Sequence, residues 1–245
     1  MRWPGLAPNL ASTNVARLSV RNGRPPDFTS FGLSAVPTVD KERALDIASQ
    51  FGDDLAARLR FIYELDELKS VLRQTLLADK SRQENSAEHS WHLAMTAMAL
   101  APLADPPVDT ERAIKILLVH DIVEIDAGDV FIYDAEARAS KEAEEIAAAD
   151  RIFGLLPEPQ ASELRDLWDE YEARETPEAR FAYSCDRLQP MLLNLAIGGG
   201  SWKRHGIKAH QVKEVNGKIA WGLPSVWEAA EAILDGAIED GDLPV

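Results

Sequence analysis

An imidazole and a carboxylate stand side by side in the most apolar stretch of the chain. His120 and Asp121 lie within residues 113–125, which otherwise consist mostly of Ala, Ile, Leu and Val. A stretch that is hydrophobic on nearly every side is typical of a helix at the centre of a fold. Ionisable side chains are costly there unless they are paired or bind a metal. The pattern therefore predicts a central helix that carries part of a metal site.

The sequence after residue 39 predicts further helices and no strand of useful length. Apolar residues recur at helical spacing, and capping residues mark several helix starts. The helices expected besides the central one cover about residues 40–50, 54–78, 86–103, 135–154, 160–174, 176–197, 208–220 and 225–240. Residues 1–39 are rich in proline and show no sustained period, which indicates an irregular or disordered extension. We therefore predict an all-α protein with one helical domain over residues 40–245.

Charge and composition exclude several classes of function. The net charge of −15 leaves no basic surplus for binding a nucleic-acid polymer. No apolar run is long enough to span a membrane, and no signal peptide is visible. The single cysteine, Cys185, rules out a disulfide within the chain and fits a reducing compartment. We expect a cytoplasmic protein with a small-molecule partner.

Two more candidate ligands lie far from the central pair in the sequence. His89 falls near the start of the helix expected over 86–103, and Asp186 falls within the helix expected over 176–197. Together with His120 and Asp121 they form a set of two imidazoles and two carboxylates. Such a set suits Mn, Co, Fe, Ni or Zn, and it suits Mg or Ca poorly. His92 lies one turn after His89 and could replace it as a ligand.

The order of these residues and their surroundings resemble the HD-domain metal-dependent phosphohydrolases. Residues 82–90, 120–129 and 186–190 are similar to the branch of that family that contains the 5′-deoxynucleotidases, and the similarity covers about residues 55–240. The resemblance implies metal ligands at His89, His120, Asp121 and Asp186. It also implies that Glu124 and Asp129 are the catalytic and substrate-contacting acids.

The residues themselves support part of this assignment. Glu124 follows His120 by four positions, so on one continuous helix both would face the same side. Many HD enzymes bind two metals through extra histidines between the HD pair and the last aspartate. This chain has no histidine between His120 and His205. We therefore expect one divalent metal.

Two further residues are candidates for contact with substrate. Arg82 is the first choice to bind a phosphate, because a guanidinium matches it with two donors, and Lys80 and Arg73 are secondary choices. Trp202 follows a run of three glycines and could stack on a base as part of a lid.

These features predict a phosphomonoesterase that removes the 5′-phosphate of deoxynucleoside monophosphates through an activated water. One alternative is an HD-fold hydrolase of another small phosphorylated metabolite. Another is a protein that senses a nucleotide without turnover. The habit of the family suggests a homodimer.

Overall fold

The part of the chain that the structure describes is almost entirely helical, as the sequence predicted. The structure is a computed structural model that describes residues 40–244, with the backbone alone over 135–140, so the expected extension over 1–39 lies outside the described residues. Its α-helices are α1 (Lys41–Ser49), α2 (Asp53–Leu65), α3 (Ser86–Leu100), α4 (Thr110–Val119), α5 (Glu124–Ala127), α6 (Ala135–Phe153), α7 (Gln160–Ala173), α8 (Pro177–Ala196), α9 (Gly200–His205), α10 (Ala209–Asn216) and α11 (Pro224–Glu239). Short 3-10 helices cover Asp66–Ser70, Ala101–Leu103 and Gly217–Trp221. None of the described helices has the length and apolar character that a membrane span requires.

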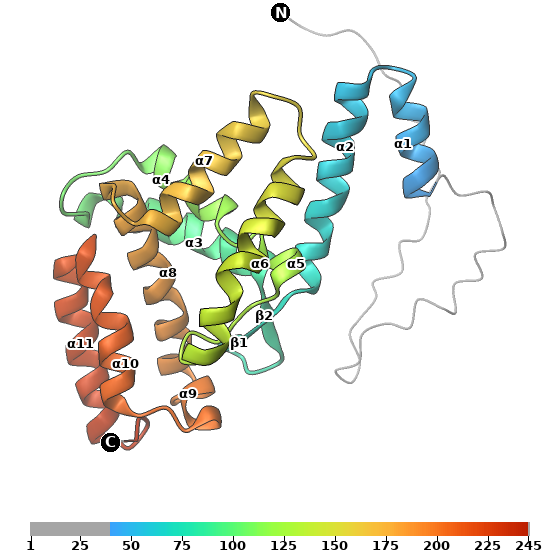
Figure 1. Cartoon of the computed structure of the whole chain (residues 1–245). Helices are drawn as coiled ribbons and strands as arrows, with labels where there is room; N and C mark the ends of the chain where they lie inside the picture. The colour runs from blue at the N-terminus through green and yellow to red at the C-terminus, as the bar shows by residue number, and fades with distance from the viewer. Residues whose placement is uncertain (1–39, 245) are drawn as a thin grey trace, which may run out of the picture. The chain divides into compact units, whose positions relative to one another are not determined.

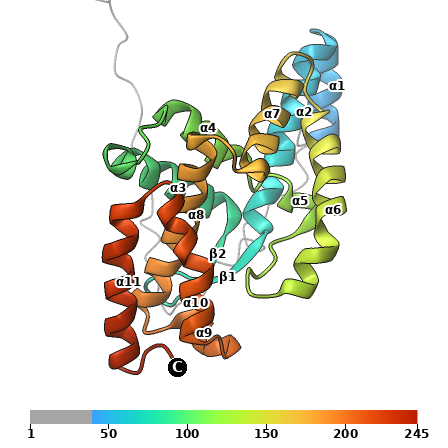
Figure 2. The same ribbon diagram turned by 60° about the vertical axis from the view of Figure 1, so that its left-hand side comes forward.

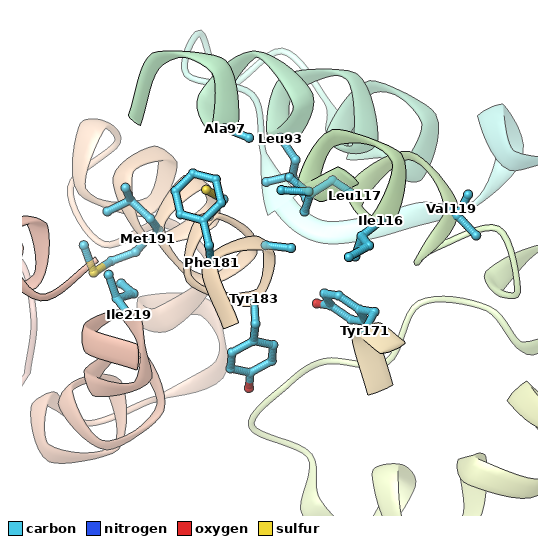
Figure 3. Packing of buried hydrophobic residues seen from close by; sticks show 14 of the residues in the cluster. Leu93, Ala97, Ile116, Leu117, Val119, Tyr171, Phe181, Tyr183, Met191 and Ile219 are labelled. Atoms are coloured by element: carbon cyan, nitrogen blue, oxygen red, sulfur yellow. The ribbon is translucent and has the colours of Figure 1, made fainter. Parts of the chain in front are cut away.

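Helix α8 is the central element of the bundle. It packs against α3, α4 and α7, while α1 and α2 lie side by side at one end of the described part and α10 and α11 at the other (Figures 1 and 2). Thr176 caps its start by accepting a hydrogen bond from the backbone N–H of Ala179, and Pro177 occupies the first turn. Pro190 lies inside the helix, which continues to Ala196. Apolar side chains from α3, α4, α7 and α8 fill the space between these helices (Figure 3).

Local capping fixes the starts of the two helices that carry the candidate histidines. Asn85 and Glu88 form the predicted capping box at the start of α3. Asp109 caps α4 by accepting hydrogen bonds from the backbone N–H groups of Glu111 and Arg112. These caps set the first turn of each helix, and in α3 that turn carries His89.

The helix expected over residues 54–78 is wrong in its second half. Helix α2 ends at Leu65, and β1 (Leu72–Leu76) follows and pairs antiparallel with β2 (Gln83–Asn85). The apolar spacing fits a helix, but burial within β1 alternates with the period of a strand, so that Arg73 and Thr75 are buried. The segment forms a strand because it pairs with another segment about ten residues away. The spacing of apolar residues within one segment does not reveal such pairing. In this strand the side chain of Arg73 points into the interior of the protein.

The central helix is shorter than predicted. Helix α4 ends at Val119, and residues 120–123 form tight turns before α5 begins at Glu124. Within this break, the N–H of Ile122 bonds to the carbonyl of Val119 three residues back. Val119, Ile122 and Val123 are all buried, so the apolar pattern is the same for a helix and for a buried turn. Gly128 then ends α5 with φ 74°, a conformation that favours glycine.

Candidate metal centre

Three of the predicted ligands meet in the interior. His89 from α3, His120 from the end of α4 and Asp186 from α8 each offer an atom within 4.8 Å of the others. The Nε2 atom of His89 lies 3.0 Å from Oδ1 of Asp186, and Nε2 of His120 lies 4.0 Å from the same oxygen. All three side chains are buried.

Asp121 lies at the edge of this group. Its Oδ1 is 2.9 Å from Nε2 of His120, and its Oδ2 is 3.9 Å from Nε2 of His89. The same Oδ2 accepts a hydrogen bond of 2.8 Å from Arg73. The break after α4 therefore allows both members of the His120–Asp121 pair to face the cluster.

The hydrogen bonds on the far side of each imidazole fix which nitrogen is free. Nδ1 of His89 lies 3.0 Å from Oε1 of Gln189, and Nδ1 of His120 lies 2.7 Å from the carbonyl of Leu117. Both partners are acceptors, so each Nδ1 donates its proton to that partner and each Nε2 is the nitrogen that faces the cluster. This arrangement is the usual one for histidines that bind a metal through Nε2.

The cluster has the properties of a cation site. Nε2 of His120 is buried, and its nearest polar neighbour is Oδ1 of Asp121 at 2.9 Å, in a geometry that does not satisfy a hydrogen bond. Burial lowers the pKa of His120, but the carboxylates of Asp121 and Asp186 outweigh it and raise the pKa to about 9. The surroundings therefore favour positive charge at this point. Buried imidazole and carboxylate donors in surroundings that favour positive charge fit a divalent metal.

A second layer of side chains holds the cluster in place. Oδ2 of Asp186 accepts a hydrogen bond of 2.7 Å from Tyr171 and another from Arg187. Gln189 bonds His89 through its oxygen and donates from its amide to Glu84 at 2.8 Å. Sequence reasoning did not single out these residues, although Arg187 and Gln189 stand beside Asp186 in the chain. Their roles depend on contacts between α8 and distant segments.

His92 does not join the cluster. Its Nδ1 lies 2.9 Å from the amide nitrogen of Gln189, and it is not among the three grouped ligand residues. Gln189 therefore separates His92 from His89. This geometry favours His89 over the alternative that the sequence left open.

The two candidate acids lie next to the cluster, and Arg73 joins them. Oε2 of Glu124 accepts a hydrogen bond of 2.6 Å from Ser86, while Arg73 lies 3.8 Å from Oε1 of Glu124 and 3.6 Å from Oδ1 of Asp129. Burial and the neighbouring carboxylates of Asp121 and Asp129 raise the pKa of Glu124 to about 8, although Arg73 and Ser86 oppose this. Glu124 can therefore exchange a proton near neutral pH.

A polar cavity of about 550 Å³ opens onto this cluster. His120, Asp121, Glu124, Asp129 and Asp186 all line it, and so do Arg73, Arg187 and Trp202. The indole of Trp202 is buried, so in this structure it is part of the wall.

Arg82 does not lie where the sequence analysis expected a phosphate-binding residue. It follows the turn between β1 and β2, its side chain is 51% exposed, and it forms an ion pair with Glu88. It is not among the residues that line the cavity, whereas Arg73 is. The hairpin explains the difference, because it places Arg73 in the interior and Arg82 near its outer turn.

The geometry predicts unequal effects for the two histidines of α3. We expect His89→Asn to weaken the binding of Mn²⁺ by more than about 100-fold, because changes in the second layer alone cost 10–100-fold. We expect His92→Asn to weaken it by about tenfold at most. Calorimetric titration of the metal-free variants measures both, with circular dichroism as the control for folding. Equal losses in the two variants would contradict the assignment.

Known proteins are similar to this chain. The family model described as HD domain matches residues 65–227, a segment that contains every residue of the cluster. The 5′-deoxynucleotidase HDDC2 of Danio rerio is 30% identical over 161 residues, which cover 65% of this chain and 72% of that protein. The human protein of that name is 30% identical over 142 residues, which cover 58% of this chain and 68% of that protein.

A solved structure is more similar still. A predicted metal-dependent phosphohydrolase from Magnetospirillum magnetotacticum MS-1 is 50% identical, with a TM-score of 0.75, and the match covers 79% of this chain and 100% of that one. The helical fold, the buried cluster and the extent of the family match agree. The chain belongs to the HD-domain family.

Proposed function

We propose that this protein is a metal-dependent phosphomonoesterase that removes the 5′-phosphate of deoxynucleoside monophosphates. The observation that carries the proposal is that His89, His120 and Asp186 converge beside a cavity. Glu124 and Arg73 line the same cavity. The names of the relatives, 5′-deoxynucleotidase and metal-dependent phosphohydrolase, support the choice of reaction and substrate.

His89, His120, Asp121 and Asp186 would hold one divalent metal, with Mn, Co, Fe, Ni or Zn as the candidates that suit these donors. When bound, such a metal supplies Lewis acidity toward a phosphoryl oxygen and toward water. The hydrogen bonds at Nδ1 of both histidines already direct Nε2 at the site. No other histidine belongs to the group of ligand residues among the described residues, which supports a single metal.

Glu124 and Asp129 would handle protons and orientation. Glu124 lies in a buried position, with Ser86 holding one of its oxygens. In our proposal Glu124 takes a proton from the attacking water, and its raised pKa suits that exchange. Asp129, whose side chain is 9% exposed and lines the cavity, orients the water or a sugar hydroxyl.

Arg73 and Arg187 would bind the phosphate. Both line the cavity, and in each the buried Nε has no hydrogen-bond partner among the residues that the structure describes. A buried N–H without an acceptor is costly, and a phosphate oxygen would satisfy it with a charge-assisted bond. Arg73 already reaches Asp121, so the phosphate would lie next to the metal ligands.

A comparison of Arg73 with Arg82 tests this assignment. Arg73→Lys keeps the positive charge beside Asp121 but removes the Nε–H and the forked geometry. We expect KM for a deoxynucleotide to rise about tenfold or more, since a hydrogen bond between charged groups is lost. Arg82→Lys is the matched control and should change KM by less than about twofold, because that side chain lies outside the cavity. An equal rise in both variants would sink the role of Arg73, and metal content is measured alongside.

A phosphate-release screen tests the function as a whole. The parent protein is loaded with Mn²⁺ or Co²⁺ and offered deoxynucleoside monophosphates, ribonucleoside monophosphates and other small phosphate esters. We expect release from the deoxynucleotides. We expect Glu124→Gln to lower turnover by at least about 100-fold while the bound metal remains, as removal of a proton acceptor would.

The other outcomes of the screen identify the alternatives. Release only from other esters would indicate a hydrolase of another phosphorylated metabolite. Thermal stabilisation by a nucleotide without any phosphate release would indicate a sensor. Normal turnover by Glu124→Gln would remove that residue from the mechanism.

We also propose that residues 40–245 form a single catalytic domain that acts in the cytoplasm as a homodimer. Helix α3 exposes an apolar stripe at helical spacing, with Trp91 64%, Met95 46% and Met98 57% exposed. Exposed apolar patches of this kind often mark protein contacts.

Light scattering tests the homodimer. It should give twice the mass of the chain for the parent protein, and Met95→Asp should lower the measured mass to that of a monomer. A monomeric parent would contradict this proposal.

A further inference from the structure

The cavity extends well beyond the metal cluster along one face of α8. Asp186, Pro190 and Asn194 line it at intervals of four residues, which is one face of a helix. At 1.5 Å per residue, the eight residues from Asp186 to Asn194 span about 12 Å. A phosphate beside Asp186 would therefore leave space for the rest of a substrate toward the C-terminal end of α8.

The two ends of the cavity differ in chemistry. Helix α7 precedes α8 and lies near its N-terminal half, and α9 follows its C-terminal end (Figures 1 and 2). On the α7 side the lining carries the charged residues Arg165, Asp169, Glu172 and Arg174. On the α9 side the lining includes six uncharged residues, which we call the uncharged end: Ile132, Tyr133, Asn194, Trp202, Val215 and Asn216. The charged residues Lys141, Glu142 and Glu145 of α6 also line the cavity. A flat, uncharged group with polar edges fits the second end and not the first.

Tyr133 occupies a defined position at the uncharged end. The amide nitrogen of Asn216 donates to its hydroxyl at 3.4 Å, and the side chain of Trp202 lies near enough to the same hydroxyl to interact with it. An indole N–H can only donate, so the phenol oxygen is the acceptor in both contacts. Burial raises the pKa of Tyr133, so the hydroxyl keeps its proton near neutral pH. That proton is then the donor that Tyr133 has to offer to a ligand in the cavity.

We propose that the end formed by Tyr133, Trp202 and Asn216 is the base subsite, and that the Tyr133 hydroxyl donates a hydrogen bond to the nucleobase. Nucleobases are planar, uncharged and carry nitrogen or oxygen acceptors at their edges. Trp202 and Asn216 act as positioning residues, because they fix the phenol oxygen and thereby the direction of its proton. This inference rests on the proposed function and names the part of the substrate that the metal cluster does not contact.

The test separates the base from the rest of the substrate. Two substrates are used, thymidine 5′-monophosphate and 2-deoxyribose 5-phosphate, which has the same phosphate and sugar but no base. We expect Tyr133→Phe to lower kcat/KM for the nucleotide roughly three- to tenfold, the range for one neutral hydrogen bond. The value for the sugar phosphate should stay within about twofold. If the sugar phosphate turns over too slowly, its inhibition constant against the nucleotide replaces kcat/KM.

A matched control removes a hydroxyl elsewhere. Tyr63 lies on α2, is 39% exposed and does not line the cavity, so Tyr63→Phe should leave both substrates unchanged. Circular dichroism and thermal unfolding confirm that each variant is folded.

Each other outcome of the test overturns the inference in a recognisable way. Equal losses on both substrates would mean that the Tyr133 hydroxyl only supports the structure. No loss on the nucleotide would mean that the base lies elsewhere. A parent inactive on every deoxynucleotide would overturn the proposed function, and the base subsite with it, while an active parent with either of the first two results would overturn the base subsite alone.

Discussion

The burial of carboxylates beside one another is the constraint on which the rest of this structure depends. Asp121, Glu124 and Asp186 lie close together, and each is at most 9% exposed. Carboxylates removed from water are costly unless opposite charge and hydrogen bonds compensate them. Two guanidinium groups, the buried Arg73 and the mostly buried Arg187, supply part of that compensation. Burial lowers the pKa of His120, yet the carboxylates of Asp121 and Asp186 raise it overall, so the cluster keeps the negative potential that favours a divalent cation.

The apolar core makes this arrangement specific. The residues that surround the cluster in α3, α4 and α8 include Leu93, Ile116, Leu117 and Phe181, none of which is exposed. Close packing of this kind holds each helix in one position, so the histidines cannot turn away without opening cavities in the core. Leu117 contributes to both, because its side chain is buried in the core and its carbonyl, in the last turn of α4, accepts the proton of Nδ1 of His120. Packing and ligand orientation are therefore properties of the same few turns of helix.

Much of the fold could be predicted from the sequence because its causes are local. The capping box of Asn85 and Glu88 and the Thr176–Pro177 start of α8 depend on neighbouring residues, and both were predicted. The strand β1 was missed because its alternating burial comes from pairing with β2, and no pattern within residues 72–76 reveals its partner. The same omission led to Arg82 as the phosphate-binding candidate. Without the hairpin, nothing in the sequence distinguishes an inward Arg73 from an outward Arg82.

The ligands of the candidate site could be predicted from residue types, but the residues that position them could not. His120 and Asp121 could be recognised in the sequence because ionisable residues are rare within an apolar stretch. The residues that orient these ligands do not differ in this way from their neighbours in the sequence. Gln189 is an ordinary polar residue in the sequence, yet in the structure it links His89 and Glu84 at 3.0 and 2.8 Å. Its function is visible only after α3 and α8 are placed side by side, since each of its bonds crosses about one hundred residues of chain. When several helices form a metal site, the ligands can therefore be recognised in the sequence by residue type. The residues that position those ligands can be identified only from the packing of the helices.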